Sequence, residues 1–435
     1  MKIKRILEID FILLFSVLTL VVIGIFFIYS SGISSAGIQL SNEYIKQIIW
    51  GATGFVFCLF VSLLDYRRLY TISLYIYFSF LLILVYTVFF GRLVNGARAW
   101  IGIGSFGIQP SEFTKIATIL VLARYLEQTR NDNNLKRYLF SIFIVMIPAG
   151  LVLLQPDLGT ALVFIPILLG MCFIAGIKKR YITYTILFIL FASILTVFPL
   201  WHMYILKNKY QFLNILSNPR AILLISTVSL AVFLISFWGY IKYKKGYFFN
   251  LAYYFSILSG SMLFSLLARN VLKEYQIMRL IVFLDPQIDP RGSGWNIIQS
   301  STAIGSGGIW GKGFLQGTQS HYRFLPQQST DFIFSIFSEE WGFIGGIIVF
   351  ALFALILFRC ISIIKTSSDN FGTYIVAGVA SMIFFHFVIN VGMTMGIMPI
   401  TGIPLIFMSY GGSSLWASFI SIGFVMAAYT RRFDR

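Results

Sequence analysis

Residues 11–30 read FILLFSVLTLVVIGIFFIYS, an apolar run of 20 residues without Asp, Glu, Lys or Arg. Because a helix rises 1.5 Å per residue, about 20 apolar residues suffice to cross the roughly 30 Å hydrocarbon core of a bilayer. The preceding Met1-Lys2-Ile3-Lys4-Arg5 resembles the charged start of a signal peptide. The run is too long for one and lacks a small-residue cleavage site, so we expect a retained first helix.

Similar apolar runs recur along the rest of the chain. Lipid cannot satisfy exposed backbone groups, so each run is predicted to be a helix. The further runs cover residues 45–64, 72–90, 111–127, 138–155, 159–177, 181–200, 221–241, 247–268, 331–358, 373–395 and 406–429. We therefore predict an all-α polytopic membrane protein of about twelve transmembrane helices, with residues 1–435 forming a single membrane domain.

Composition agrees with a membrane protein. Hydrophobic residues make up 58% of the chain and charged residues 11%, whereas soluble domains carry about 25% charged residues. The net charge of +17 does not indicate a nucleic-acid partner, because the basic residues cluster in the short links between apolar runs. Cys58, Cys172 and Cys360 lie singly within apolar runs, so neither a disulfide framework nor a zinc site is indicated.

The positions of the basic residues predict the orientation. If the N-terminus is inside, most basic links fall on the cytoplasmic side, as the positive-inside rule requires. These links contain Arg67–Arg68, Arg124 to Arg137, Lys178–Arg180, Lys242–Lys245, Arg359 with Lys365, and Arg431–Arg432. Both termini are then cytoplasmic, and residues 269–330 form a long extracytoplasmic loop. Residues 95–110, on the same outer side, are expected to form a re-entrant or interfacial piece.

The long outer loop has the composition of a ligand-contacting surface. Its part from Gly292 to Gly317 is rich in glycine, which lets backbone amides approach a ligand closely, although a flexible surface loop would look similar. Lys312 follows a glycine as in nucleotide-binding phosphate loops. However, Ser306 and Gly313 stand where that motif needs Gly and Ser or Thr, so we exclude a nucleotide site.

Asp331 ends this loop, and two interpretations of it are equally supported by the residues alone. In one, Ser329 or Thr330 caps the next helix and Asp331 complements the helix dipole. In the other, Asp331 is a partly desolvated general base within reach of Arg323 and Lys312. Glu339 and Glu340 lie about 12 Å deeper along the same helix, where charges are usually functional or paired.

Two other helix starts on the outer side carry polar residues. Gln109-Pro110-Ser111-Glu112 begins the fourth helix, with Lys115 on the same face as Glu112 and Arg98 just before the turn. Asp157 begins the sixth. Helix capping and a local ion pair would explain these residues, but converging helix starts with Lys and Arg also suit a pyrophosphate.

The three histidines do not suggest a metal site. His202, His321 and His386 are widely separated, and no HExxH motif or Ser-His-Asp order is present, so a metalloprotease or hydrolase is not indicated. His386 and Asn390 share one helix face, which favours hydrogen bonding between helices.

Several motifs resemble those of the SEDS family of shape, elongation, division and sporulation proteins, and they span nearly the whole chain in the family's order. They are Gly96-Ala97 with Trp100-Ile101, Gln109 to Glu112 with Lys115, Gln155 to Thr160, Ser293-Gly294-Trp295, Ala303 to Gly308, Gly311-Lys312-Gly313, Gly317 to Ser320, Phe324-Leu325-Pro326, Thr330 to Phe334, Glu339-Glu340, Pro404-Leu405 and Ser409 to Ser413. Gly317-Thr318-Gln319 favours the elongation branch over the division branch.

The resemblance implies a peptidoglycan glycosyltransferase in the bacterial cytoplasmic membrane. Such an enzyme polymerises lipid II, the undecaprenyl-pyrophosphate-linked disaccharide pentapeptide, on the outer face during elongation and rod-shape maintenance. It works among membrane lipids with a class B penicillin-binding transpeptidase. Asp331 matches the family's catalytic aspartate, and Glu112 with Lys115 matches a supporting pair.

Two features depart from the family pattern. Gln327 stands where a glutamate is usual, so a carboxylate there cannot be essential in this chain. Residues 221–268 form an extra transmembrane hairpin added to a ten-helix core, and the even number of helices leaves the downstream topology unchanged.

The expected mechanism is a single inverting displacement. Asp331 accepts the proton of a sugar hydroxyl as that oxygen attacks the anomeric carbon of the pyrophosphate-linked donor. The departing pyrophosphate is expected to be stabilised by basic residues, with Mg²⁺ or Mn²⁺ as an optional cofactor. The basic residues are Arg98, Lys115, Lys312 and Arg323. Asp157, Glu339 and Glu340 are assigned orienting or metal-holding roles.

Two other functions fit a polytopic protein with polar residues. A lipid-linked precursor flippase would need a polar track through the bilayer, whereas the polar groups here gather at the outer helix ends. A non-catalytic scaffold of the cell-wall synthase would tolerate loss of the loop carboxylates.

Overall fold

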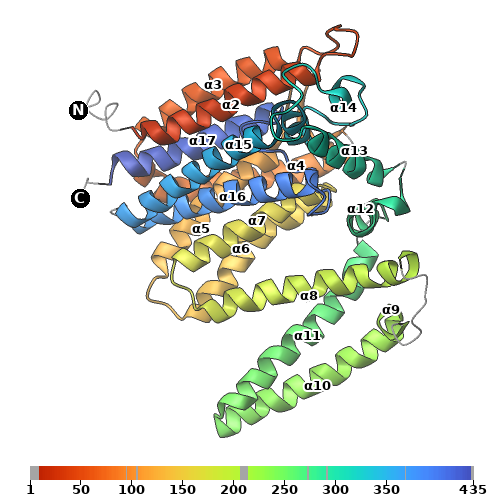
Figure 1. Ribbon diagram of the computed structural model, residues 1–435. Coiled ribbons are helices and arrows are strands. Elements are labelled where there is room, and N and C mark those ends of the chain that lie inside the picture. The colour runs from red at the N-terminus through yellow and green to blue at the C-terminus, as the bar shows by residue number, and fades with distance from the viewer. Residues whose placement is uncertain are drawn as a thin grey trace. The chain divides into compact units, whose positions relative to one another are not determined.

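All twelve predicted apolar runs correspond to helices. The computed structural model describes residues 9–94, 96–103, 106–205, 214–271, 274–290, 292–367 and 369–432. The twelve helices are α2 (Phe11–Ser31), α3 (Glu43–Leu63), α4 (Leu69–Phe90), α5 (Pro110–Gln128), α6 (Asn134–Leu154), α7 (Leu158–Ile174), α8 (Lys179–Tyr204), α10 (Pro219–Tyr243), α11 (Gly246–Val271), α15 (Ile333–Thr366), α16 (Asn370–Thr394) and α17 (Gly412–Thr430) (Figure 1).

Ten of these helices are long and apolar enough to cross a membrane. Of the other two, α7 has only 17 residues, and α5 carries Glu112, Lys115, Arg124 and Glu127 along its 19 residues. The prediction of an all-α polytopic membrane protein is confirmed. Two boundaries differ by more than four residues: α15 continues to Thr366 and does not end at residue 358, and the last helix begins at Gly412 and not at residue 406.

The chain divides into two compact units. Unit 1 comprises Met1–Ile177 with Gln299–Arg435, and unit 2 comprises Lys178–Ile298. The most enclosed membrane helices of unit 1 are α16 and α17. In the most apolar 18-residue stretch of each, 61% and 72% of the residues are buried, against 22–50% in the other membrane helices of this unit. The centre of unit 1 therefore lies around α16 and α17. Side chains of these two helices are fixed by packing and can hold neighbouring segments in place.

Unit 1 has two chemically distinct ends. Figure 1 shows that α2 begins and α17 ends at the same end of the bundle. There Arg359 of α15 pairs with Asp10 at 2.7 Å, and the Tyr66 hydroxyl donates to the carboxylate of Asp369. The start of α15 lies at the other end, where Ser30 of α2 donates to Glu340. Residues 312–320, which contact Glu339, also lie at this second end.

Unit 2 is built on α8, α10 and α11, together with the short helices α9 (Asn214–Ser217) and α12 (Glu274–Leu284). The α10–α11 hairpin corresponds to the extra apolar runs at 221–241 and 247–268. Leu195, Ile222 and Met262, one from each long helix, form its small apolar core. Gly239 lets α10 approach α11 closely, because a Cβ there would lie 2.8 Å from the ring of Phe248 on α11.

Residues 92–94, 97–103 and 106–108 form a small sheet that the all-α prediction did not include. Strands β1 (Arg92–Val94), β2 (Ala97–Ile103) and β3 (Phe106–Ile108) are antiparallel in the order β1-β2-β3. Leu93 pairs with Arg98, and Gly102 with Gly107. Hairpin strands can satisfy their backbone groups locally, which helps such a piece to exist between two membrane helices.

The segment between α11 and α15, expected as a loop, contains short helices. They are α12, the 3₁₀ helix η3 (Pro286–Ile288), α13 (Ser293–Ser306) and α14 (Thr318–His321). Its glycine-rich part packs directly onto α15, so it is an ordered part of the fold.

Helix α15 is broken at Gly342, and the glycine-rich segment forms hydrogen bonds with the backbone groups on both sides of the break. Gly342 has φ 63° and ψ −161°, outside the helical region. The amides of Lys312 and Gly313 donate to the carbonyls of Glu339 and Glu340, both at 3.0 Å. In return, the carbonyls of Gly308 and Ile309 accept from the amides of Phe343 and Ile344 at 2.9 and 3.2 Å. Four backbone groups that the break would leave unpaired in an apolar region are thereby satisfied.

Candidate active site

The turn that carries Asp331 is fixed through three successive carbonyl groups. Each accepts one hydrogen bond from a distant part of unit 1. The bonds are Tyr410 N to Ser329 O at 2.8 Å, Ser409 Oγ to Thr330 O at 2.5 Å, and Asn390 Nδ2 to Asp331 O at 3.0 Å. The backbone of Asp331 is therefore held by α16 and by the segment between α16 and α17, and not by its own helix alone.

The helix-cap interpretation of this turn was wrong. The N-cap residue of α15 is Phe332, and no side chain caps the helix. The Thr330 hydroxyl points back to Gln327, where it donates to the carbonyl and to the side-chain oxygen, both at 3.3 Å. Gln327 has φ 53°, and its carbonyl also accepts from the Asp331 amide at 3.2 Å. Gln327 thus shapes the turn through its backbone and amide group, without needing a carboxylate.

The carboxylate of Asp331 is half-buried and lies beside Gly402. A Cβ added to Gly402 would be 3.6 Å from Asp331 Oδ2. Gly402 has φ 72°, a conformation that side-chain-bearing residues adopt at a cost of about 1–2 kcal/mol. The glycine therefore allows the 401–411 segment to turn tightly against the carboxylate.

Asn390 and His386 hold this segment from α16. Asn390 Nδ2 also donates to the carbonyl of Ile403 at 2.8 Å, and His386 Nδ1 lies 3.1 Å from the carbonyl of Pro404. The two side chains were expected to make hydrogen bonds between helices. His386 of α16 does contact another helix, through Lys115 of α5 at 3.3 Å. Both side chains also bind the backbone of the segment that faces Asp331.

The predicted pair on α5 is a buried ion pair. Lys115 Nζ lies 2.9 and 2.8 Å from the two carboxylate oxygens of Glu112, and the side chains are only 1% and 6% exposed. Lys115 Nζ also lies 3.3 Å from His386 Nε2. Glu112 and Lys115 therefore support the 401–411 segment indirectly, through His386, and their charges offset each other.

Asp157 is the N-cap of α7 and joins α7 to the start of α5. Its carboxylate accepts from the Thr160 amide at 3.0 Å, the Thr160 hydroxyl at 2.8 Å and Gln109 Nε2 at 2.8 Å. Gly159 lies against the segment before Gly402, since a Cβ there would be 2.4 Å from the carbonyl of Thr401. Asp157 thus links the start of α7 to the start of α5.

Glu339 is an anchor for residues 312–320. Its buried carboxylate accepts from Lys312 Nζ at 2.7 Å, the Thr318 hydroxyl at 3.1 Å and the Gln319 amide at 3.0 Å. With a fourth contact from the Ser320 amide at 3.4 Å, the lone pairs of both oxygens have protein partners.

Glu340 is a second anchor, and it joins the same segment to α2. Its carboxylate accepts from the Ser30 hydroxyl and, at 3.0 Å, from the Leu315 amide, and His321 Nε2 lies 3.8 Å away. Both carboxylates on α15 thus have partners within the protein: Glu339 pairs with Lys312, and Glu340 accepts hydrogen bonds.

The predicted basic residues occupy three different environments. Lys115 is buried against Glu112, and Lys312 is partly exposed against Glu339. Arg98 on β2 is exposed, as is Arg323, which has φ 57° in the turn after α14. The guanidinium groups of Arg98 and Arg323 are therefore the more accessible of the four cations.

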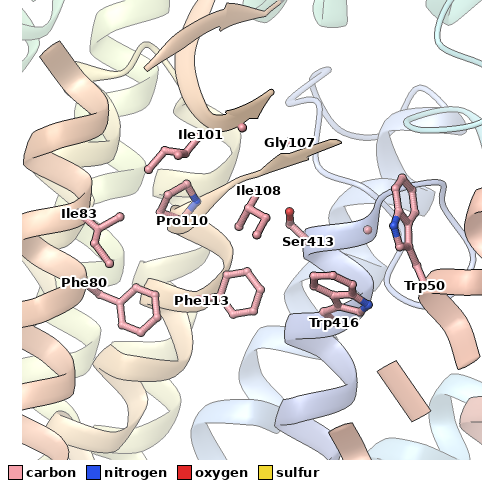
Figure 2. A pocket seen from close by; sticks show the side chains of 12 residues that line it. Trp50, Phe80, Ile83, Ile101, Gly107, Ile108, Pro110, Phe113, Ser413 and Trp416 are labelled. Atoms are coloured by element: carbon pink, nitrogen blue, oxygen red, sulfur yellow. The ribbon is translucent and has the colours of Figure 1, made fainter. Parts of the chain in front are cut away.

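An apolar cavity of about 420 Å³ lies beside the start of α5 (Figure 2). Its walls come from α3, α4, α5, α17 and the small sheet. Figure 2 shows the rings of Trp50, Phe80, Phe113 and Trp416 around it, with Ser413 at its edge. The Ser413 hydroxyl accepts from the Gln109 amide at 3.0 Å, so the cavity adjoins the residue that contacts Asp157. An apolar compartment therefore lies next to the polar end of the bundle.

The described residues offer no ready-made metal site. Among them, no three His, Cys, Asp or Glu side chains converge in a way that could hold a metal ion. A divalent cation near Asp331 would need oxygen ligands from its substrate as well as from the protein.

Sequence reasoning missed the positioning role of residues 401–411. Gln47 of α3 donates to the carbonyl of Ser409 at 3.0 Å and accepts from the Gly411 amide at 3.2 Å. Burial raises the pKa of Tyr410 in this segment to about 12, with a smaller effect from Glu43, so its hydroxyl stays neutral at physiological pH. The available signal was that residues 396–412 carry no charge and include four glycines and two prolines, which are uncommon inside a helix.

The fold and the site define a polytopic membrane protein with a carboxylate held at one end of its helical bundle. Residues 11–231 and 221–433 match the family described as cell cycle proteins of the FtsW, RodA and SpoVE type. The chain belongs to this family.

One protein of known name and two solved structures resemble the chain over nearly its full length. The peptidoglycan glycosyltransferase RodA of Treponema pallidum (strain Nichols) is 49% identical over 432 residues, which cover 99% of this chain and 100% of that protein. A chain from a structure of a peptidoglycan synthase complex superposes with a TM-score of 0.68 at 25% identity, covering 98% of this chain and 99% of the other. The rod shape determining protein RodA of Thermus thermophilus superposes with a TM-score of 0.61 at 24% identity over 98% of both chains, which supports the fold.

Proposed function

We propose that the chain is a peptidoglycan glycosyltransferase that polymerises lipid II into glycan strands on the outer face of the bacterial cytoplasmic membrane during elongation. The observation that carries this proposal is the 49% identity, over the full length of both proteins, with a peptidoglycan glycosyltransferase. The local geometry agrees, because a half-buried carboxylate on a rigid turn is suited to accept a proton.

Asp331 acts as the general base in this mechanism. Its carboxylate takes the proton from a sugar hydroxyl while that oxygen forms a bond to the anomeric carbon of the donor sugar. The bond from that carbon to the pyrophosphate oxygen breaks, and the electron pair leaves with the pyrophosphate. Attack opposite to the leaving group inverts the anomeric carbon, and no covalent enzyme intermediate is needed.

In this proposal, Arg98 and Arg323 stabilise the negative charge on the departing pyrophosphate. Both guanidinium groups are exposed, and planar guanidinium donors suit phosphate oxygens. Lys115 and Lys312 act indirectly, since each is already paired with a carboxylate of the protein. Glu339 and Glu340 hold residues 312–321 in place, and any Mg²⁺ or Mn²⁺ would add charge stabilisation on the pyrophosphate when bound.

The lipid chain of the substrate needs an apolar binding site near the reacting groups. We assign it to the 420 Å³ cavity between α3, α4, α5, α17 and the small sheet, which is lined by aromatic and aliphatic side chains. The cavity adjoins Gln109 and Ser413, so a lipid bound there would bring its pyrophosphate towards the polar end of the bundle. A soluble sugar donor would have no use for such a compartment.

The protein is proposed to work with a class B penicillin-binding transpeptidase. A structural relative of similar fold is part of a peptidoglycan synthase complex in which polymerization and crosslinking are coordinated. Glycan strands become a wall only after crosslinking, so a crosslinking partner fits a polymerase at the outer face.

A polymerisation assay tests the proposal and separates it from its alternatives. Purified full-length chain is given lipid II in detergent, alone and with the transpeptidase, and the glycan products are separated by size. We expect polymer from wild-type protein and at least a 100-fold lower rate from Asp331→Asn, which keeps the size and hydrogen-bonding capacity of the side chain. A flippase or a scaffold would give no polymer with wild-type protein, and near-normal polymerisation by a folded Asp331→Asn protein would contradict the catalytic assignment.

A further inference from the structure

Unit 2 carries an unbalanced set of basic residues at one end. Between Asp157 and Glu274 the sequence contains no Asp or Glu. Six exposed basic residues lie where α8 begins and where α10 passes into α11; they are Lys178, Lys179, Arg180, Lys242, Lys244 and Lys245. We call this set the basic surface.

Helix packing brings the two halves of the basic surface together. The Tyr253 hydroxyl of α11 donates to the carbonyl of Arg180 at 3.0 Å, and the Arg180 guanidinium lies 5.3 Å from the centre of the Phe249 ring. Because α11 begins at Gly246, directly after Lys245, these contacts join the start of α8 to the tip of the α10–α11 hairpin. The six basic side chains therefore belong to one continuous surface and not to two separate ones.

These charges differ from three basic residues of unit 1. There, Arg359 pairs with Asp10 at 2.7 Å, Arg431 donates to the carbonyl of Leu63 at 2.9 Å, and Arg137 donates to that of Leu126 at 2.8 Å. None of the six residues of the basic surface forms an ion pair with any residue that the structure describes. Their charge is thus available to an external anion.

The neighbours of the basic surface indicate that this anion lies at a membrane boundary. Lys242 Nζ is 4.9 Å from the centre of the Trp238 ring, and Tyr243 and Tyr247 are exposed beside it. On α10, Ile241 next to Lys242 and Ile235 about two turns before it are exposed and apolar. Trp and Tyr beside lysines, at the edge of an apolar helix surface, are typical of the level at which lipid headgroups lie.

We infer that the basic surface binds the phosphate groups of anionic phospholipids and thereby holds unit 2 against a negatively charged leaflet. Clusters of four to eight Lys and Arg residues next to a membrane helix attract anionic lipids through their summed charge. The aromatic rings add contacts at the headgroup level, while the exposed aliphatic residues face the acyl chains. A soluble acidic macromolecule would meet only the cationic part of this surface.

Lipid retention by the purified full-length protein tests the inference. Protein in detergent is mixed with equal amounts of phosphatidylglycerol and phosphatidylcholine, and bound lipids are counted by native mass spectrometry. Wild-type protein is expected to retain phosphatidylglycerol in preference. The triple variant Lys242→Gln, Lys244→Gln, Lys245→Gln should lower that preference at least fivefold, whereas the triple Lys→Arg variant at the same positions should keep it.

A matched control removes the same three charges from exposed positions of unit 1, by Arg130→Gln, Lys136→Gln and Lys365→Gln. This control should keep the wild-type preference. Equal loss in the control, or full retention in the first triple variant, would overturn the inference. Greater displacement of the lipid by inorganic phosphate than by sodium chloride of the same ionic strength would also overturn it, because the surface would then be a site for free phosphate. Should the first variant fail to fold, wild-type protein decides, because its preference must fall as salt screens the charges; a salt-independent preference would overturn the inference.

Discussion

One amide nitrogen of Asn390 donates both to the carbonyl of Asp331, at 3.0 Å, and to the carbonyl of Ile403, at 2.8 Å. Because both bonds need the nitrogen, the amide has only one workable orientation. A single buried side chain of α16 thus links the turn before α15 to the 401–411 segment. The position of the proposed base depends on the core of the bundle and not on a surface loop.

Replacing Asn390 with Leu should weaken both the fold and the reaction. The substitution keeps the volume but leaves two carbonyls without their donor, which we expect to lower the free energy of unfolding by about 2 kcal/mol. A displaced Asp331 should also lower kcat about tenfold or more, with a smaller change in KM for lipid II. Thermal unfolding in detergent and polymerisation kinetics give the two readouts.

Ser381→Ala is the matched control on the same helix. Its hydroxyl donates to the carbonyl of Ala377, one turn back within α16, at 2.8 Å, and does not reach the site. We expect wild-type kinetics from this variant. An Asn390→Leu protein with wild-type kcat would show that the two bonds do not position Asp331.

The buried pair Glu112 and Lys115 should show strong coupling. Lys115→Met leaves the Glu112 carboxylate buried without its partner, which typically costs about 3–5 kcal/mol of stability. Adding Glu112→Gln removes that uncompensated charge, so the double variant should regain a large part of the loss. The free energies of unfolding of both single variants and the double variant complete the cycle; simple additivity would contradict a coupled pair.

The helices could be predicted from the sequence because lipid imposes one dominant constraint on the backbone. Runs of apolar residues must be helical where they face hydrocarbon, and each of the twelve runs contains a helix. Residues 406–411 follow the same apolar pattern at Ile406, Phe407 and Met408 but are not helical. Phe407 has φ 69°, and the Ser409 hydroxyl accepts from the Leu405 amide at 2.8 Å. Hydropathy cannot distinguish a buried turn of this kind from the start of a helix.

The candidate site could be predicted only in part, since its residues meet through tertiary packing. Local spacing sufficed for Glu112 with Lys115, three residues apart on one helix. Nothing local indicated that Asn390 would meet Asp331, or that Glu339 would bind Lys312 across the break at Gly342. The sheet of β1, β2 and β3 was also not anticipated, because its three strands are short and only partly apolar.

Loss of the Glu339 carboxylate should release residues 312–320 from α15. Glu339→Gln weakens the bonds from Lys312 Nζ, the Thr318 hydroxyl and two backbone amides, and bonds to charged groups contribute about 1.5–3 kcal/mol each. Because 1.4 kcal/mol of local stability corresponds to a factor of ten, trypsin should cut near the exposed Arg323 about tenfold faster. The cleavage site and rate are measured on intact protein by mass spectrometry.

Glu127→Gln provides the comparison, since it removes one carboxylate from the last turn of α5, far along the chain from residues 312–320. Its cleavage rate at Arg323 should equal that of wild-type protein. If Glu339→Gln is cut no faster, then the backbone bonds to the break in α15 hold the segment without the carboxylate.

The apolar cavity beside α5 should select for the length of the lipid chain. Ile108 lines it from β3, and Ile108→Trp would fill part of its 420 Å³. If the cavity seats the lipid, this variant should raise KM severalfold for a long-chain lipid II while leaving KM for a short-chain analogue nearly unchanged. Leu93→Trp adds the same ring to exposed β1 of the same sheet, outside the cavity lining, and should leave both constants unchanged. Equal effects of Ile108→Trp on the two substrates would mean that the sheet affects the reaction through the head of the substrate, and the lipid would then have to bind elsewhere on the bundle.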